Sequence, residues 1–264
     1  MRSIAETRPI LVIGPARSGT TIITSALIAG AGIEGFREGH FLPLMTHLNR
    51  TIDNFYNTKK GVRNNPKHMV THIEPAAVKE RLNTTLRAMA EELCPQSVWL
   101  DKSPDHVMVE GIPDLRRTWP GARFIFARRR GIENINSRLH KFPHVDFKRH
   151  CQIWAKTMRA WIEHRDLVKD CSIEMDQWCI ATEPENSARQ IAEFLELGDR
   201  ERQQMGHIFA NKRPQSTGSD VLEKPLDIHD AGWSDQQIEV FRKTCGNLST
   251  VLGYSETSSY FSEN

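Results

Sequence analysis

An apolar strand pattern that runs directly into a glycine-containing loop is the feature that most restricts the fold of this chain. Residues 9–14 (Pro-Ile-Leu-Val-Ile-Gly) form a short, continuous apolar run, which is typical of a buried parallel strand. After the loop, residues 20–29 show an apolar helical pattern that Gly30 and Gly32 close. A strand, a loop and a helix in this order indicate an α/β fold.

The loop itself reads Gly-Pro-Ala-Arg-Ser-Gly-Thr-Thr over residues 14–21. Its glycines let the backbone turn tightly, so that successive N–H groups and the helix N-terminus point at an anion. The hydroxyls of Ser18, Thr20 and Thr21 add hydrogen-bond donors. The loop of nucleoside triphosphatases has a lysine where this chain has Thr20, and the only cation here is Arg17. We therefore expect the loop to bind an anion other than the γ-phosphate of ATP.

The rest of the chain alternates between strand and helix patterns. Further strands are predicted at residues 97–100, 123–127 and 172–175. Helices are predicted at residues 74–94, 105–118, 131–141, 147–168, 184–195, 199–210 and 234–252, the last with Ser234 as N-cap. This alternation predicts a single α/β domain over residues 1–264. Its expected architecture is three-layered and P-loop-like, with a central parallel sheet of four to five strands flanked by helices.

Three segments lack a regular pattern. Residues 33–73 are irregular and rich in His, Asn and Gly, and a segment of this length inside a domain is usually functional, so we expect it on the acceptor side of a site. Residues 211–232 are polar and predict a mobile loop, and residues 255–264 predict a frayed tail. In the helix that follows the first segment, one predicted apolar face comprises Val78, Leu82, Leu86, Met89, Ala90 and Leu93.

Composition excludes several classes of protein. The 264 residues carry 35 Lys and Arg against 33 Asp and Glu, a net charge of +2, which argues against an obligate nucleic-acid coat. No apolar run approaches the roughly 20 residues of a membrane span, and the start has no apolar core of a signal peptide. Five cysteines without a C-x-x-C pair argue against a disulfide framework or structural zinc. We expect a cytoplasmic protein without nucleic-acid or membrane partners.

The arginines are concentrated in one place. Residues 115–138 hold seven of the 23 arginines and a single acid, Glu133. Three of these arginines, Arg128 to Arg130, are adjacent where the strand at 123–127 runs into a helix, and they repel one another unless an anion or solvent relieves them. Ligands of α/β sheets bind at the carboxyl ends of strands, so this stretch predicts a second anion site.

Both anion sites resemble those of the sulfotransferases that use 3′-phosphoadenosine 5′-phosphosulfate (PAPS). Residues 15–21 are similar to the P-R-S-G-T-T loop of bacterial members, with Ala16 as an apparent insertion. The resemblance implies that the 5′-phosphosulfate is held by Arg17, Ser18, Gly19, Thr20 and Thr21. A family arginine and a serine eight residues later hold the 3′-phosphate, which here match Arg129 and Ser137, with Arg128 as the alternative because Arg-Arg-Gly replaces the usual R-D-P.

Weaker similarity extends the resemblance over about residues 9–254. It includes the strand and Asp-Gln-Trp at 172–178, Phe-Leu-Glu-Leu at 194–197 and Leu-Gly-Tyr at 252–254, and it has a gap at about 40–95. These segments support the fold rather than any particular contact. They leave the acceptor side of the chain uncharacterised.

The resemblance also suggests the catalytic groups. Asp-Lys-Ser-Pro at 101–104 is similar to the D-K-[TS]-P motif of bacterial members, which makes Lys102 the catalytic lysine. Glu38 is the first candidate for the general base, His40 the second and His106 the third. Asp101 either orients Lys102 or is the acid of a Mg²⁺ site. Lys102 and Arg17 can carry the charge of the leaving group, so no metal is expected.

We therefore expect an enzyme that transfers a sulfuryl group from PAPS to a hydroxyl, less often an amine, of a small molecule. Adenosine 3′,5′-bisphosphate is then the second product. An ATP-dependent P-loop kinase is one alternative, and a non-catalytic module that binds anions or nucleic acids through the arginine cluster is another. The identity of the acceptor and the oligomeric state stay open at this point.

Overall fold

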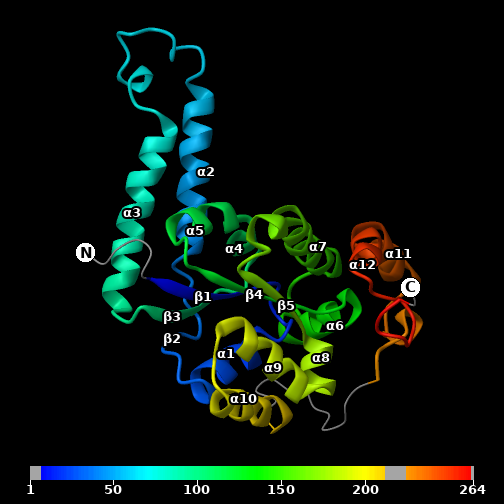
Figure 1. Cartoon of the computed structure of the whole chain (residues 1–264). Helices are drawn as coiled ribbons and strands as arrows, with labels where there is room; N and C mark the ends of the chain where they lie inside the picture. The colour runs from blue at the N-terminus through cyan, green and yellow to red at the C-terminus, as the bar shows by residue number, and fades with distance from the viewer. Residues whose placement is uncertain (1–6, 212–223, 263–264) are drawn as a thin grey trace.

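Five parallel strands form one sheet in the order β2-β3-β1-β4-β5 (Figure 1). The computed structural model describes residues 7–211 and 224–262. The strands are β1 (Arg8–Ile13), β2 (Gly35–Phe36), β3 (Val98–Lys102), β4 (Arg123–Arg128) and β5 (Ser172–Asp176). The predicted α/β fold with a central parallel sheet is confirmed. Of the five strands, only the two-residue β2 lies outside the patterns recognised in the sequence.

Helices cover both faces of the sheet, and the alternation of side chains along β1 shows why. Leu11 and Ile13 belong to one buried apolar cluster, which is completed by helices including α4, α6 and α7. Ile10 and Val12 belong to a second cluster, formed with α1, α9 and α10. Successive residues of a strand point to opposite faces, so each face of β1 needs its own cover. Figure 1 shows the resulting three layers.

Most predicted helices are present with small shifts at their ends, but the one predicted at 105–118 is divided at Gly111, and the short helix Gln177–Thr182 was not predicted. Ser234 caps α11 in a capping box with Gln237, as its position suggested. The α-helices are α1 (Thr20–Ser25), α2 (Pro43–Thr58), α3 (Pro75–Leu93), α4 (His106–Glu110), α5 (Ile112–Thr118), α6 (Gly131–Lys141), α7 (Phe147–His164), α8 (Gln177–Thr182), α9 (Pro184–Leu195), α10 (Asp199–Asn211), α11 (Asp235–Phe241) and α12 (Asn247–Val251). Short 3₁₀ or π segments are η1 (Ala26–Gly30), η2 (Met69–Thr71), η3 (Arg165–Val168), η4 (Ile228–Asp230) and η5 (Arg242–Gly246).

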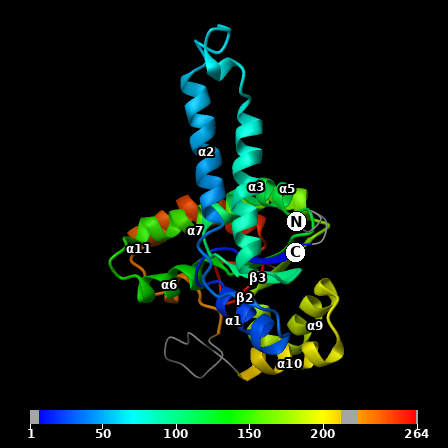
Figure 2. The same cartoon turned by 90° about the vertical axis from the view of Figure 1, so that its left-hand side faces the viewer.

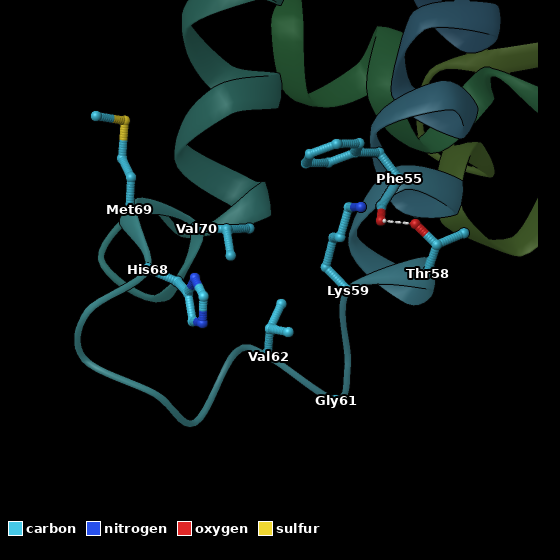
Figure 3. A pocket seen from close by; sticks show the side chains of 8 residues that line it. All are labelled: Phe55, Thr58, Lys59, Gly61, Val62, His68, Met69 and Val70. Carbon is cyan, nitrogen blue, oxygen red and sulfur yellow. Dashed lines mark hydrogen bonds between the residues drawn. The ribbon is translucent and has the colours of Figure 1, made fainter.

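The prediction of an irregular segment at 33–73 is wrong, because 16 of its residues form α2. Met45, Leu48, Ile52 and Phe55 recur with helical spacing, so the sequence signal for α2 was present and was overlooked. Helix α2 runs antiparallel to α3, and the two form a hairpin that projects from the body of the molecule (Figures 1 and 2). A cavity of 470 Å³ at the hairpin tip is lined by residues that include Phe55, Val62 and Met69 (Figure 3).

The buried face of α3 also differs from the predicted one. Asn83, Leu86, Arg87 and Ala90 are buried, whereas Leu82, Met89 and Leu93 are exposed. Arg87 is buried because it pairs with Glu91 and donates to the carbonyl of Thr118. Polar groups with such partners can occupy the inner face of a helix. An apolar stripe is consequently left on the outer face.

The prediction of a frayed tail at 255–264 is wrong for residues 255–262, and 263–264 lie outside the described residues. Arg130, which is 1% exposed, donates hydrogen bonds to the carbonyls of Ser255, Thr257 and Ser259 and pairs with Glu133. The tail therefore closes over a buried charge. Most of the predicted mobile loop at 211–232, namely 212–223, also lies outside the described residues.

Replacing Arg130 by alanine should destabilise the protein strongly. The change leaves the buried Glu133 carboxylate without its partner, so the free energy of unfolding should fall by about 3–5 kcal/mol in urea denaturation. The control is Arg117→Ala, which removes an exposed pair with Asp114 and should cost less than about 1 kcal/mol. Equal, small losses for both variants would contradict this role of Arg130.

Candidate functional site

Three adjacent strands deliver the predicted site residues to one edge of the sheet. The phosphate loop follows β1, Lys102 ends β3, and Arg129 follows β4. In the sheet register, Val12 of β1 lies beside Lys102. Because the three strands are parallel, their carboxyl ends share this edge, where ligands of open α/β sheets bind.

The loop after β1 is held in a fixed shape by its neighbours. Gly14 has φ 132°, and a Cβ atom built there would lie 2.2 Å from the carbonyl oxygen of Ala127 in β4, so only glycine fits. From α6, the side-chain amide of Asn134 donates to the carbonyl of Ala16 at 3.0 Å and to Ser18 Oγ at 2.9 Å. The loop is therefore tied to β4 and α6 before any ligand binds.

The predicted halves of the anion site meet at Arg17. Arg17 has a left-handed backbone, with φ 73°, and its Nε donates to Ser137 Oγ at 2.9 Å. Arg129 Nη1 in turn donates to the carbonyl of Arg17 at 3.2 Å. Burial, together with the charge of Arg129, lowers the pKa of Arg17. Arg17 is thus joined in one cationic cluster to Arg129 and Ser137, which lie 112 and 120 positions later in the sequence.

The two arginines that flank Arg129 are engaged elsewhere. Arg128 forms ion pairs with Glu174 at 3.0 Å and Asp176 at 3.5 Å, both on β5. Arg130 is buried with Glu133 and the C-terminal segment. The Nε atom of Arg129, by contrast, is buried without a hydrogen-bond partner. Of the three adjacent arginines, Arg129 is therefore the one left to face an anion at the loop.

Arg138, Asn134 and His150 extend this cluster and were missed in the sequence. Arg138 is buried, and its Nε donates to His150 Nδ1 at 3.2 Å. Burial, followed by the charge of Arg17, lowers the pKa of Arg138, and burial followed by Arg138 lowers that of His150. Within residues 7–211 and 224–262, neither Arg129 nor Arg138 has a carboxylate at ion-pair distance. The only sequence signal was the position of Arg138 directly after Ser137.

Lys102, Glu38 and His40 come together as a second group. The Lys102 side chain is 3% exposed and its ammonium donates to Glu38 Oε1, whereas Glu38 is 52% exposed. The other oxygen of Glu38 lies 3.3 Å from His40 Nε2. The lysine is thus buried at the end of β3, and the carboxylate faces solvent beside a histidine.

Asp101 supports the segment that carries Glu38 and His40. Ser103 Oγ donates to Asp101 Oδ2 at 2.9 Å and accepts the backbone N–H of His40 at 3.0 Å. His40 has φ 54°, a conformation that costs energy for a residue with a side chain. A Cβ atom on Gly39 would lie 1.6 Å from Asp101 Oδ1. Asp101 therefore fixes the backbone at 38–40 from behind.

His106, the third candidate base, has a different partner. Its Nδ1 lies 2.7 Å from Asp105 Oδ1, and the hydrogen bond to His106 is the largest of several effects that bring the pKa of Asp105 to about 2. Asp105 also caps α4 by accepting the N–H of Val107. His106 is thus committed to the start of α4. In the described part of the chain, no three His, Cys, Asp or Glu side chains gather as a metal site.

The comparisons with known proteins identify the family of this chain. Residues 9–201 match the family described as the sulfotransferase family, which is well over half of the chain. The chain belongs to the sulfotransferase family. No protein with a curated function matches the sequence. No helix in the described residues is long and apolar enough to cross a membrane.

Solved sulfotransferases share the fold of this family member at low sequence identity. The sulfotransferase STF9 of Mycobacterium avium is 14% identical with a TM-score of 0.57, over 93% of this chain and 77% of STF9. The sulfotransferase domain of the Synechococcus PCC 7002 olefin synthase is 17% identical, with a TM-score of 0.53 and 82% of each chain covered. The sulfotransferase domain from the curacin biosynthetic pathway is 17% identical with a TM-score of 0.52, over 94% of this chain and 98% of that domain.

The environment of Asp101 predicts a specific dependence of stability on pH. Burial raises the pKa of Asp101 to about 6 in the folded state, although the Ser103 hydrogen bond opposes the shift. The folded state therefore holds this proton more tightly than the unfolded state does. The contribution of Asp101 to the free energy of unfolding is full at low pH and is lost as the pH rises toward 6.

Relative to Asp101→Asn, wild type should lose about 2–3 kcal/mol of unfolding free energy between about pH 4 and pH 7. Urea denaturation of both proteins across this range measures the difference. A difference that does not change with pH would show that Asp101 is not buried as described.

Proposed function

We propose that this sulfotransferase uses PAPS as donor and transfers its sulfuryl group to a hydroxyl, less often an amine, of a small molecule. The observation that carries the proposal is the contact of Arg17 with Ser137 and Arg129. It joins a lysine-free phosphate loop to a second cationic segment. A nucleotide with anionic groups at both the 5′ and the 3′ position matches two adjacent anion sites of this kind.

The residues present fit such a nucleotide. Arg129 offers a buried Nε atom without a partner, which an anion would satisfy. We assign the 3′-phosphate to Arg129 and Ser137 rather than to Arg128, because Arg128 is neutralised by two carboxylates. We assign the 5′-phosphosulfate to the loop residues Arg17, Ser18, Gly19, Thr20 and Thr21.

The group formed by Lys102, Glu38 and His40 is our candidate for the chemistry at the acceptor. We propose that Glu38 accepts the proton of the acceptor hydroxyl as its oxygen forms a bond to sulfur, because its carboxylate is exposed and ionisable. Lys102 and Arg17 stabilise the negative charge left on the phosphate oxygen when its bond to sulfur breaks. PAPS would supply the activated sulfuryl group, and adenosine 3′,5′-bisphosphate would leave. His40 is the second candidate for the base.

Loss of Arg129 should weaken nucleotide binding. Arg129→Ala removes charge-assisted hydrogen bonds to the 3′-phosphate, so the dissociation constant for adenosine 3′,5′-bisphosphate should rise about 10- to 100-fold in calorimetry. Arg116→Ala is the matched control, since Arg116 is paired with Asp170 at the surface and should leave binding unchanged. Unchanged binding in Arg129→Ala would remove Arg129 from the 3′-phosphate site.

Loss of Glu38 should separate binding from turnover. Glu38→Gln keeps the shape of the side chain and removes the base, so kcat should fall about 10²- to 10⁴-fold while bisphosphate binding is retained. Turnover is measured as transfer of label from PAPS to a mixture of hydroxyl compounds. The comparison is His40→Asn, because asparagine tolerates the left-handed backbone of this residue. If His40→Asn abolished turnover and Glu38→Gln did not, His40 would be the base.

A further inference from the structure

Helix α3 carries an apolar stripe beside its buried face. Leu82, Met89 and Leu93 are 37%, 48% and 70% exposed, and Val78 is half-buried. With 3.6 residues per turn, positions 78, 82, 89 and 93 lie along one side of the helix, over about 22 Å. Figures 1 and 2 show α3 as part of the hairpin that projects from the body of the molecule.

An aligned stripe of this kind differs from scattered apolar residues on a surface. Single exposed apolar side chains are common, but contiguous ones usually mark a contact with another molecule. The buried residues of α3, which include Asn83 and Ala90, lie on the neighbouring face of the helix, about 100° around its axis from the stripe. The stripe therefore has the properties of an interface.

The order of residues along the stripe makes it complementary to itself. Val78 and Leu93 are equally far from the midpoint of the stripe, between Thr85 and Leu86, and so are Leu82 and Met89. In an antiparallel copy that crosses at this point, Val78 lies opposite the partner's Leu93. Leu82 then lies opposite the partner's Met89. Each apolar side chain of one helix thus meets an apolar side chain of the other.

The charges beside the stripe select the same arrangement. Arg81 and Glu92 are 11 residues apart, about three turns, so they flank the stripe on the same side. Both are exposed, and neither is in an ion pair within the described residues, whereas Lys79 and Glu91 have partners inside the chain. In an antiparallel pair of this register, Arg81 lies about 3 Å along the helix axis from the partner's Glu92, within reach of its long side chain, and the contact forms twice. In a parallel pair, Arg81 and the partner's Glu92 would lie about 16 Å apart along the helix and could not pair.

We propose that this chain forms a homodimer through antiparallel contact of two α3 helices, related by a two-fold axis at Thr85 and Leu86. A second copy is the occupant that the stripe fits, because its apolar residues repeat with opposite order about one point, and Arg81 and Glu92 do so about a point one residue further along the helix. The proposal does not depend on the identity of the donor or acceptor.

Sedimentation velocity across micromolar concentrations tests the apolar part of the interface. Wild type should be dimeric and Met89→Lys monomeric, because a lysine at the centre of the stripe would be desolvated in the dimer. Leu167→Lys is the control, since Leu167 is similarly exposed on η3 and should leave the dimer intact. Wild type that is monomeric up to about 100 µM, or a Met89→Lys variant that stays dimeric, would overturn the proposal.

A charge exchange tests the antiparallel register. Arg81→Glu and Glu92→Arg each place like charges together twice and should each weaken the dimer about 5- to 30-fold, whereas the double variant should restore the wild-type dissociation constant. Circular dichroism confirms that each exposed substitution leaves the fold unchanged. Failure of the double variant to restore dimerisation, or no effect of either single change, would contradict the two-fold pairing.

Discussion

The close approach of the loop after β1 to the end of β4 is the contact on which the rest of the site depends. It requires glycine at position 14, where a Cβ atom would meet the Ala127 carbonyl at 2.2 Å. Asn134 completes the attachment by bonding the loop to α6. Since β4 continues into Arg129 and α6 carries Ser137, fixing the loop against both elements brings Arg17 to Ser137. The two segments that the sequence predicts as anion sites are thereby joined by one packing constraint.

The site divides into a cationic side and an acidic side that are supported differently. On the cationic side, Arg17 donates to a serine, Arg129 to a backbone carbonyl and Arg138 to a histidine, and neither Arg129 nor Arg138 has a carboxylate at ion-pair distance within residues 7–211 and 224–262. On the other side, the buried Lys102 is matched by the exposed Glu38. The strained backbone at His40 is held by Ser103 and Asp101. Such strain persists only where surrounding contacts fix it, as at many functional sites.

Patterns local in the sequence predicted most of the fold and part of the site. Continuous apolar runs predicted four of the five strands, and the loop at 14–21 was recognised from its glycines and hydroxyls. The choice between Arg128 and Arg129 was not readable, because it depends on Glu174 and Asp176 of the neighbouring strand β5. Helix α2 was readable from Met45, Leu48 and Ile52, which recur with helical spacing, and was overlooked. The order of the tail was missed because it depends on Arg130, more than 120 residues away.

The central proposal is that the site formed by the loop at 14–21, Arg129 and Ser137 binds a nucleotide with anionic groups at both ends, and not a magnesium-bound diphosphate. Calorimetric titration of wild-type protein with adenosine 3′,5′-bisphosphate and, separately, with ADP and Mg²⁺ tests it most directly. We predict one-to-one binding of the bisphosphate with a dissociation constant of about 1–100 µM, unaffected by a chelator, and much weaker binding of magnesium ADP. Tight binding of magnesium ADP with no binding of the bisphosphate would contradict the account.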